Sequence, residues 1–227
     1  MISVAIDGPS GAGKSSIARK AAERFGFIYV DTGAIYRTIG LAADRNGIDT
    51  KDKASVIALL PSLQIDLRYN DNGEQCMILN GIDVSAHIRL PEVSMFASDV
   101  SAIPEVREYL VDMQRDMAKR FDVIMDGRDI GTVILPDADL KIFLTASPEE
   151  RAKRRREQLA RKGTVLPFDE VLADMKRRDE QDTNRQAAPL KAAADAVIVD
   201  STEYTEQETI GVISDLIQNR TGKTPKM

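Results

Sequence analysis

One stretch near the N-terminus constrains the fold of this chain more than any other. Residues 8–15 read GPSGAGKS and fit the pattern G-x-x-x-x-G-K-[ST], with an apolar, strand-like run before them at residues 2–6. A helical pattern follows, with Ile17, Ala21 and Phe25 on one face. Glycines let successive backbone N–H groups point inward and the helix N-terminus adds its positive dipole end, so this P-loop pattern predicts a phosphate site. A glycine-rich turn that binds nothing is the alternative, and the correct spacing and flanks argue against it.

The last two residues of the loop point to a nucleotide with a metal ion. Lys14 is expected to reach the β- and γ-phosphates. Ser15 supplies a hydroxyl suited to Mg²⁺, which keeps most of its waters and takes few protein ligands. An aspartate that ends a buried strand in such a protein usually faces the metal, and Asp126 ends the apolar run at residues 121–126.

The composition excludes several classes of protein. The 227 residues, 43% apolar and 30% charged, suffice for one domain with insertions or for two small domains. No apolar run approaches the roughly 18 residues of a membrane span, and the chain starts directly with a strand, so we expect a cytoplasmic protein. The single cysteine, Cys76, fits a reducing compartment and is interpreted as a packing residue rather than a catalytic thiol. His87 has no second histidine or cysteine near it, which argues against a zinc site.

The charge is distributed unevenly. A formal net charge of -5 argues against a general nucleic-acid binder, yet residues 151–162 hold seven basic side chains and one acid, Glu157. A basic segment on an acidic protein favours a local polyanion site over a surface for DNA or membrane. A solvated helix face is the alternative, and the nearby phosphate loop makes it less favoured.

The order of the elements predicts an α/β fold with a five-stranded parallel sheet flanked by helices. The expected strands are short apolar runs that alternate with helical patterns, at residues 2–7, 27–30, 121–126, 140–144 and 196–199. Between them, alternating residues from Leu63 and two Asn-Gly turns, at 72–73 and 80–81, predict a small antiparallel β insertion at about residues 62–90. The tail at residues 221–227 lacks apolar anchors and is expected to be frayed.

A helical lid is predicted at residues 151–185. Gly163 and Pro167 break the basic helix, and a second charged helix begins near Asp169. Two charged helices joined by such a break suit a mobile flap that closes over a site.

The wider pattern narrows the class of phosphate-binding protein. No Asn-Lys-x-Asp stretch is present for guanine recognition, and Asp126 is followed by Gly127 rather than glutamate, which disfavours GTPase switches and motor-type ATPases. A small-molecule kinase remains. Such an enzyme must neutralise the negative charge on two phosphate-bearing substrates and exclude water from the site of transfer. The basic helix and four further arginines could supply the charge; they are Arg37, Arg128, Arg178 and Arg185. Position alone leaves Arg37 equally open to being an ordinary surface arginine.

Six stretches together resemble bacterial cytidylate kinases, a group within the nucleoside monophosphate kinases. They are the loop at residues 8–16, DTGAIYR at 31–37, the β insertion, residues 98–107, DGRDIGT at 126–132 and residues 178–185. The resemblance covers residues 2 to about 219, and the 126–132 stretch and the insertion are its most specific parts. Thr32 and Ser16 stand where many relatives have serine and threonine, and both keep the hydroxyl.

This resemblance implies ATP-dependent phosphorylation of CMP or dCMP. It implies that ATP is held by the loop and by two residues of the basic helix: Gly8, Pro9, Ser10, Gly11, Ala12, Gly13, Lys14, Ser15, Ser16, Arg151 and Arg154. It implies that Mg²⁺ is held by Ser15 and Asp126, and that the catalytic residues are Lys14, Arg128 and Arg155. Arg151, Arg154 and Arg155 would belong to the lid that closes over ATP.

The acceptor site follows from the same resemblance. The residues implied to bind CMP are Thr32, Arg37, Ser98, Arg107, Arg128, Asp129, Arg178, Asp182 and Arg185. Arg37, Arg128 and Arg185 would hold the phosphate. Ser98, Arg107 and Asp129 would read cytosine, whose amino donor lies beside two acceptors and so complements a carboxylate and an arginine. Arg178 and Asp182 would hold the sugar.

The implied domain organisation has three parts. They are a core P-loop domain at 1–36, 91–150 and 186–227, a monophosphate-binding part at 37–90 and the lid at 151–185. We expect a monomer that binds a small-molecule substrate, with no nucleic-acid or membrane partner. Two alternatives stay open: a related kinase for UMP, shikimate or gluconate, and a regulator that binds ATP without turning it over.

Overall fold

The computed structural model describes residues 1–90, 92–161 and 163–226. Its contacts divide the chain into two compact units, one formed by residues 1–29 with the chain from Ala118 onward, the other by residues 30–117. Pro91, where the core was predicted to resume, and Lys162, the end of the predicted basic run, lie outside the described residues, as does Met227.

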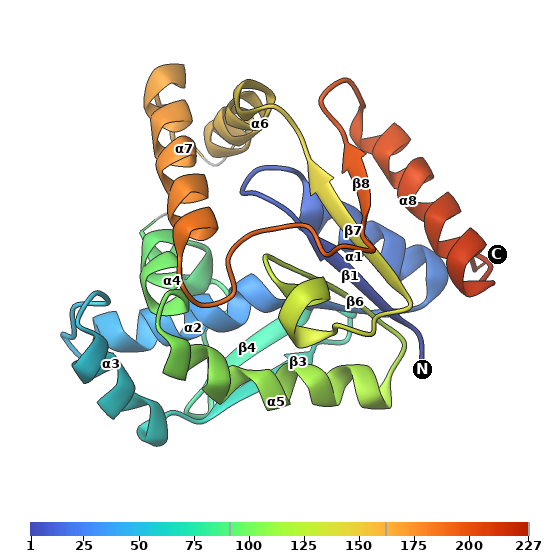
Figure 1. The fold of residues 1–227 in the computed structure, drawn as a ribbon. Coiled ribbons are helices and arrows are strands. Elements are labelled where there is room, and N and C mark those ends of the chain that lie inside the picture. The colour runs from blue at the N-terminus through green and yellow to red at the C-terminus, as the bar shows by residue number, and fades with distance from the viewer. Residues whose placement is uncertain (91, 162, 227) are drawn as a thin grey trace. The chain divides into compact units, whose positions relative to one another are not determined.

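The first unit is built on the sheet that carries the loop (Figure 1). Its five strands lie in the order β2-β6-β1-β7-β8; their bounds are β1 Ser3–Asp7, β2 Ile28–Asp31, β6 Val123–Gly127, β7 Leu140–Thr145 and β8 Val197–Asp200. β1 pairs in parallel with β6 on one side and β7 on the other, and Ile6 lies beside Asp126. The predicted parallel sheet is confirmed, and the carboxyl ends of its strands bring the loop and the Asp126 stretch to one edge.

Helices cover this sheet because their apolar faces match its buried strands. The helices of the unit are α1 Lys14–Phe25, α6 Pro148–Arg161, α7 Phe168–Asn184 and α8 Glu206–Thr221. Ile17, Ala21 and Phe25 of α1 join one buried cluster with residues of β1, β7 and α8, as their spacing predicts. α1 packs against β6 and β1, α8 packs against β7, and the two helices contact each other (Figure 1). Gly26 ends α1 with φ of 72°, a conformation that favours glycine.

A single turn of π-helix, Ile130–Ile134, follows β6. Nothing in the sequence predicts it, because the apolar residues of this stretch have no clear period. It is the element that connects the end of β6 to the return of the chain toward β7.

The second unit has its own core. Its elements are α2 Thr32–Arg45, α3 Lys53–Leu59, α4 Val93–Ser101, most of α5 Pro104–Arg120, two short 3₁₀ turns at Leu60–Ser62 and His87–Arg89, and the strands β3 Ile65–Tyr69, β4 Gln75–Leu79 and β5 Ile82–Asp83. The strands pair antiparallel in the order β3-β4-β5, which confirms the predicted insertion. Asn80 and Gly81 both have positive φ, at 49° and 81°, as the tight turn between two antiparallel strands requires.

The tail differs from its prediction in the part that the structure describes. Lys223 donates to a carboxylate oxygen of Asp122 at 2.9 Å and lies over the ring of Phe27. The backbone N–H of Lys226 donates to the carbonyl of Arg24 at 2.7 Å. Polar contacts therefore hold residues that have no apolar anchor, so the prediction of a frayed tail is wrong for residues 221–226.

None of the helices in the described parts of the chain combines the length and the apolar character that a membrane crossing requires.

Candidate active site

The loop of residues 8–15 has a backbone that only glycine permits at key points. Gly8 and Gly13 have φ of 148° and 89°. A Cβ at Gly8 would collide with the carbonyl oxygen of Leu144 on the neighbouring strand. The conformation that exposes backbone N–H groups is therefore built into the loop before any ligand binds.

Lys14 is buried at the start of α1. Its side-chain Nζ donates to the carbonyl of Pro9 at 2.8 Å. Burial lowers the pKa of Lys14 to about 7, and the nearby positive charge of Arg128 acts in the same direction. The carboxylates of Asp126, Asp7 and Asp182 act in the opposite direction without restoring the usual pKa, so an anion that binds there would favour the charged lysine.

We expect the binding of ATP to return Lys14 to its charged form. Between pH 8 and 9 the amine is mostly neutral in the free protein, since its pKa of about 7 lies below that range, whereas bound phosphates raise the pKa again. Binding should then take up close to one proton per site. Calorimetric titration with ATP in two buffers of different ionisation heat measures this number, and Lys14→Met is the control that should show no uptake. Binding with no proton uptake in the native protein would contradict the lowered pKa.

Ser15 and Asp126 meet across the edge of the sheet. The Ser15 hydroxyl donates to Oδ2 of Asp126 at 2.9 Å, and the hydroxyl of Tyr29 donates to Oδ1 at 2.8 Å. Asp126 is buried, whereas Ser15 is exposed. Across the described ranges there is no group of three or more histidine, cysteine or acidic residues that could hold a metal ion, so this hydroxyl and carboxylate are the pair to consider.

Five predicted acceptor residues of the first unit lie just after β6, on α7 or directly after α7. Arg128 donates through Nε to Asp182 at 2.8 Å, and Arg185 lies 3.6 Å from Asp129 and 3.9 Å from Asp182. Burial alone would raise the pKa of Asp182, but the surrounding arginines, first Arg128 and then Arg178, hold it below its usual range. The prediction that these distant stretches serve one site is consistent with this buried network of alternating charges.

Two of the remaining acceptor residues lie at the start of α2. Thr32 is its first residue and is buried. Arg37, one turn later, pairs with Asp31 at 2.8 Å, and the other carboxylate oxygen of Asp31 accepts the backbone N–H of Ala34 and so caps the helix. Arg37 is therefore held in one orientation by Asp31, which belongs to the same DTGAIYR stretch at residues 31–37.

Ser98 and Arg107 lie on α4 and α5 of the same unit. Both side chains are buried. Arg107 donates to the carbonyl of Ser101 at 3.1 Å, and its guanidinium carbon lies 5.3 Å from the centre of the Tyr36 ring. Within the described parts of the chain the Ser98 hydroxyl has no hydrogen-bond partner. An unsatisfied buried hydroxyl costs about 1–3 kcal/mol, which a ligand could recover.

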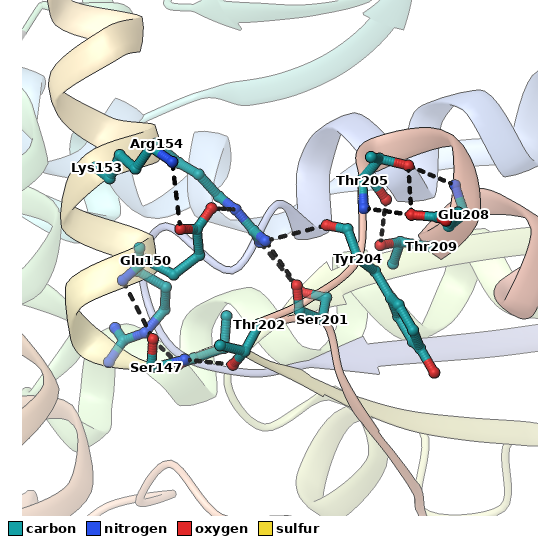
Figure 2. Close-up of polar contacts among 12 residues, drawn as sticks. Ser147, Glu150, Lys153, Arg154, Ser201, Thr202, Tyr204, Thr205, Glu208 and Thr209 are labelled. Atoms are coloured by element: carbon teal, nitrogen blue, oxygen red, sulfur yellow. Dashed lines mark hydrogen bonds and ion pairs between the residues drawn. The ribbon is translucent and has the colours of Figure 1, made fainter.

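The basic helix α6 does not present all its arginines to solvent. Arg151 is buried; it donates to the carbonyl of Ser10 in the loop at 2.9 Å and pairs with Asp179 of α7 at 2.6 Å. Arg154 pairs with Glu150 at 3.1 Å and donates to the carbonyl of Ser201 at 2.6 Å (Figure 2). The structure thus brings Arg151 to the loop at residues 8–15 and Arg154 to the loop that follows β8.

Arg155 is placed differently from these two. It donates to Gln158 of its own helix at 2.7 Å. A cavity of about 460 Å³ opens beside α6, lined by Ser147, Glu149, Glu150, Lys153, Arg156, Phe168, Thr202 and Glu203. A catalytic role for Arg155 remains a prediction and requires a change in the position of its side chain.

Three residues of this region were missed by reasoning from the sequence. They are Asp7, Tyr29 and Asp179. Each forms its hydrogen bonds or ion pair with a residue far away in the chain, so no local sequence pattern predicts its role. The one available signal was the acidic residue directly before the loop, Asp7, which follows three apolar residues of β1 and is an unusual choice for a buried strand end.

Comparison with known proteins identifies the family of this chain. The family model described as cytidylate kinase matches residues 4–219. The cytidylate kinase of Caldicellulosiruptor bescii is 49% identical over 215 residues, which cover 95% of each chain. That of Caldanaerobacter subterraneus subsp. tengcongensis is 47% identical over 220 residues, covering 97% of this chain and 96% of the relative.

A solved structure supports the fold alone. An uncharacterized protein from Eubacterium ventriosum superposes with a TM-score of 0.55 at 13% identity, covering 97% of this chain and all of that one. The full-length match to named relatives, rather than this likeness, decides the family. With its phosphate loop, its β insertion and the motif after β6 all inside the matched range, the chain belongs to the cytidylate kinase family.

Proposed function

We propose that the protein transfers the γ-phosphoryl group of ATP to CMP or dCMP, giving ADP and CDP or dCDP. The observation that carries this proposal is the phosphate loop, in which Gly8 and Gly13 have φ of 148° and 89° and which ends in the buried Lys14, within a match to cytidylate kinases over nearly the whole chain. A loop of this conformation at a helix N-terminus, with a buried amine beside it, favours a bound anion. A phosphoryl group in transfer, bound by the loop on one side and the acceptor arginines on the other, supplies that charge.

The donor is proposed to bind along residues 8–16. Backbone N–H groups of the loop and the N-terminus of α1 would hold the phosphates, and Arg151 is already in contact with the loop through Ser10. The hydroxyl of Ser15 and the carboxylate of Asp126 fit Mg²⁺ because both are oxygen donors and the ion takes few protein ligands. When bound, the ion would neutralise charge on the β- and γ-phosphates.

The acceptor is proposed to bind to the residues that the likeness to cytidylate kinases implies. Arg37, Arg128 and Arg185 would bind its phosphate, and Arg178 and Asp182 its sugar. Ser98, Arg107 and Asp129 would read the base. The unpaired Ser98 hydroxyl supports a polar ligand, since it has a free hydrogen-bonding capacity in a buried place.

The reaction needs no general base under this proposal. The attacking CMP phosphate oxygen is already anionic; it bonds to the γ-phosphorus as the bond to the β–γ bridging oxygen breaks. Lys14 and Arg128 would stabilise the charge that shifts during transfer, joined by Arg155 when the lid closes. Positioning and charge neutralisation then supply most of the rate.

Release of ADP with a panel of acceptors tests the proposed function. The panel contains CMP, dCMP, UMP, AMP, shikimate and gluconate, each at several concentrations. We expect the largest kcat/KM with CMP or dCMP. Turnover confined to shikimate or gluconate would identify a related kinase, and ATP binding without turnover of any acceptor would identify a regulator.

Turnover of dCMP is a separate expectation. Asp182 and Arg178 can hydrogen-bond to a 3′-hydroxyl as well as to a 2′-hydroxyl, so the loss of the 2′-hydroxyl should not abolish binding. The measurement is kcat/KM for CMP and dCMP under identical conditions. No detectable turnover of dCMP where CMP reacts fully would refute this assignment of the sugar site.

Residues 151–185 are proposed to act as a lid. α6 and α7 pack on each other through a small cluster of their own, formed by Ala152, Leu159, Val171 and Met175, so they can move together. Arg151 and Arg154 pair with Asp179 and Glu150, and bound phosphates would compete for these arginines. We expect amide exchange in this segment to slow markedly when ATP and CMP are mimicked by one linked analogue. The strands of the sheet serve as the internal control, and equal exchange with and without the analogue would argue against a lid.

A further inference from the structure

The carboxylate of Asp7 holds the backbone that follows Asp129. Asp7 ends β1, directly before the phosphate loop, and is 4% exposed. Its Oδ1 accepts the backbone N–H of Ile130 at 2.7 Å, and its Oδ2 accepts that of Gly131 at 2.8 Å. One side chain on the central strand therefore binds two consecutive peptide groups from a segment more than 120 residues away.

These two peptide groups are the ones that a helical turn leaves without internal partners. Residues Ile130–Ile134 form the π-turn, and the first N–H groups of a helical turn have no acceptor within it. The carbonyl of Asp129 closes the turn by accepting the N–H groups of Val133 at 2.9 Å and Ile134 at 3.3 Å. Asp129 itself has φ of −146° and ψ of 24°, outside the helical region. The backbone of Asp129 is thus fixed between the end of β6 and a turn that Asp7 anchors.

A carboxylate is the group that this arrangement requires. Both of its oxygens accept hydrogen bonds, whereas the amide of asparagine would accept from one N–H and present a donor to the other. The environment opposes the charge: burial raises the pKa of Asp7 to about 6, against the hydrogen bonds from Gly131 and Ile130. A buried charge that does not favour folding by itself suggests a role in the site rather than in stability.

We propose that Asp7 is a positioning residue that sets the place of the Asp129 carboxylate and, through it, the selectivity for cytosine over uracil. The inference rests on the proposed function, since it assigns base reading to Asp129. Asp7 also leads directly into the loop that holds ATP, so the same strand end aligns the donor site and the base-reading residue. Small displacements are sufficient to matter, because a misplacement of about 1 Å can cost a hundredfold in rate.

The test is a double-mutant cycle with CMP and UMP as acceptors. Asp7→Asn should lower the ratio of kcat/KM for CMP to that for UMP by about tenfold or more. In the Asp129→Ala background the same change should alter the ratio less than about twofold, because the residue through which it acts is gone. Asp139→Asn is the matched control; Asp139 accepts the N–H and the hydroxyl of Ser3 at the opposite end of β1. It should leave the ratio unchanged, whatever it does to stability.

The outcomes separate this proposal from the proposed function. If the native protein does not phosphorylate CMP, or does not prefer it to UMP, the function fails before any variant is compared. If the native protein prefers CMP and Asp7→Asn slows both acceptors in parallel, Asp7 is only a structural residue and the proposal is overturned. Should Asp7→Asn not fold, Asp7→Glu keeps both acceptor oxygens and the charge but shifts them by one methylene. A folded Asp7→Glu protein with the native ratio would overturn the proposal as well.

Discussion

Lys14→Met is expected to abolish phosphoryl transfer while the fold stays intact. The Lys14 side chain is buried between the loop and the end of β6. Water therefore cannot replace the lysine as a positively charged hydrogen-bond donor. Removing one preorganised donor from such a site costs about 10²–10³ in kcat, and this lysine also carries charge to the transferring group, so we expect the loss to reach at least 10³-fold. Methionine has a similar length and fills the same space, and it removes an amine whose charged form burial disfavours. Stability should therefore hold or rise.

The measurement combines ADP release with CMP and a thermal melt of each protein. Lys20→Met is the matched control: Lys20 lies on the same helix, is 42% exposed in its side chain and pairs with Glu206 at 3.1 Å. An exposed pair of this kind contributes little, so the control should keep native activity and stability. Near-native turnover by the Lys14→Met protein would show that the loop at residues 8–15 does not take part in catalysis.

Asp129→Ala is expected to reduce the preference for CMP over UMP. A carboxylate only accepts hydrogen bonds, so Asp129 suits the 4-amino group of cytosine and opposes the 4-oxo group of uracil. A buried polar group left unpaired costs about 1–3 kcal/mol, and two facing acceptors also repel, so the native preference should be at least about tenfold to a hundredfold. The variant should lose activity with CMP and gain relative activity with UMP, because the repulsive contact disappears with the attractive one.

A structural role for Asp129 gives a different result. Asp129 lies 3.6 Å from Arg185, and a residue that only held this arginine in place would affect both acceptors equally. Comparing kcat/KM for CMP and UMP in the native protein, in Asp129→Ala and in Arg185→Ala distinguishes the two roles. Parallel losses for both acceptors in Asp129→Ala, matched by Arg185→Ala, would assign Asp129 to holding the arginine and base reading to other residues.

Features carried by short stretches could be predicted from the sequence. The strand, loop and helix of residues 2–25 could be predicted because their conformation depends on neighbours within the stretch. These neighbours are glycines at the turns, apolar residues at helical spacing and Gly26 at the end. The antiparallel insertion could be predicted for the same reason, since Asn80 and Gly81 specify the turn that sets the pairing of β4 with β5. The family followed from motifs of this kind, because they carry the groups proposed to bind phosphate and base.

Contacts across the chain were decided by the tertiary structure alone. The strand order β2-β6-β1-β7-β8 places Asp7 against the turn after β6, and no local pattern states this order. The same holds for Arg151, which reads as one of seven basic side chains but is buried against Ser10, and for the pairing of Arg128 with Asp182. Local sequence determines which groups are available at each strand end, whereas burial and the choice of partner depend on which elements pack side by side.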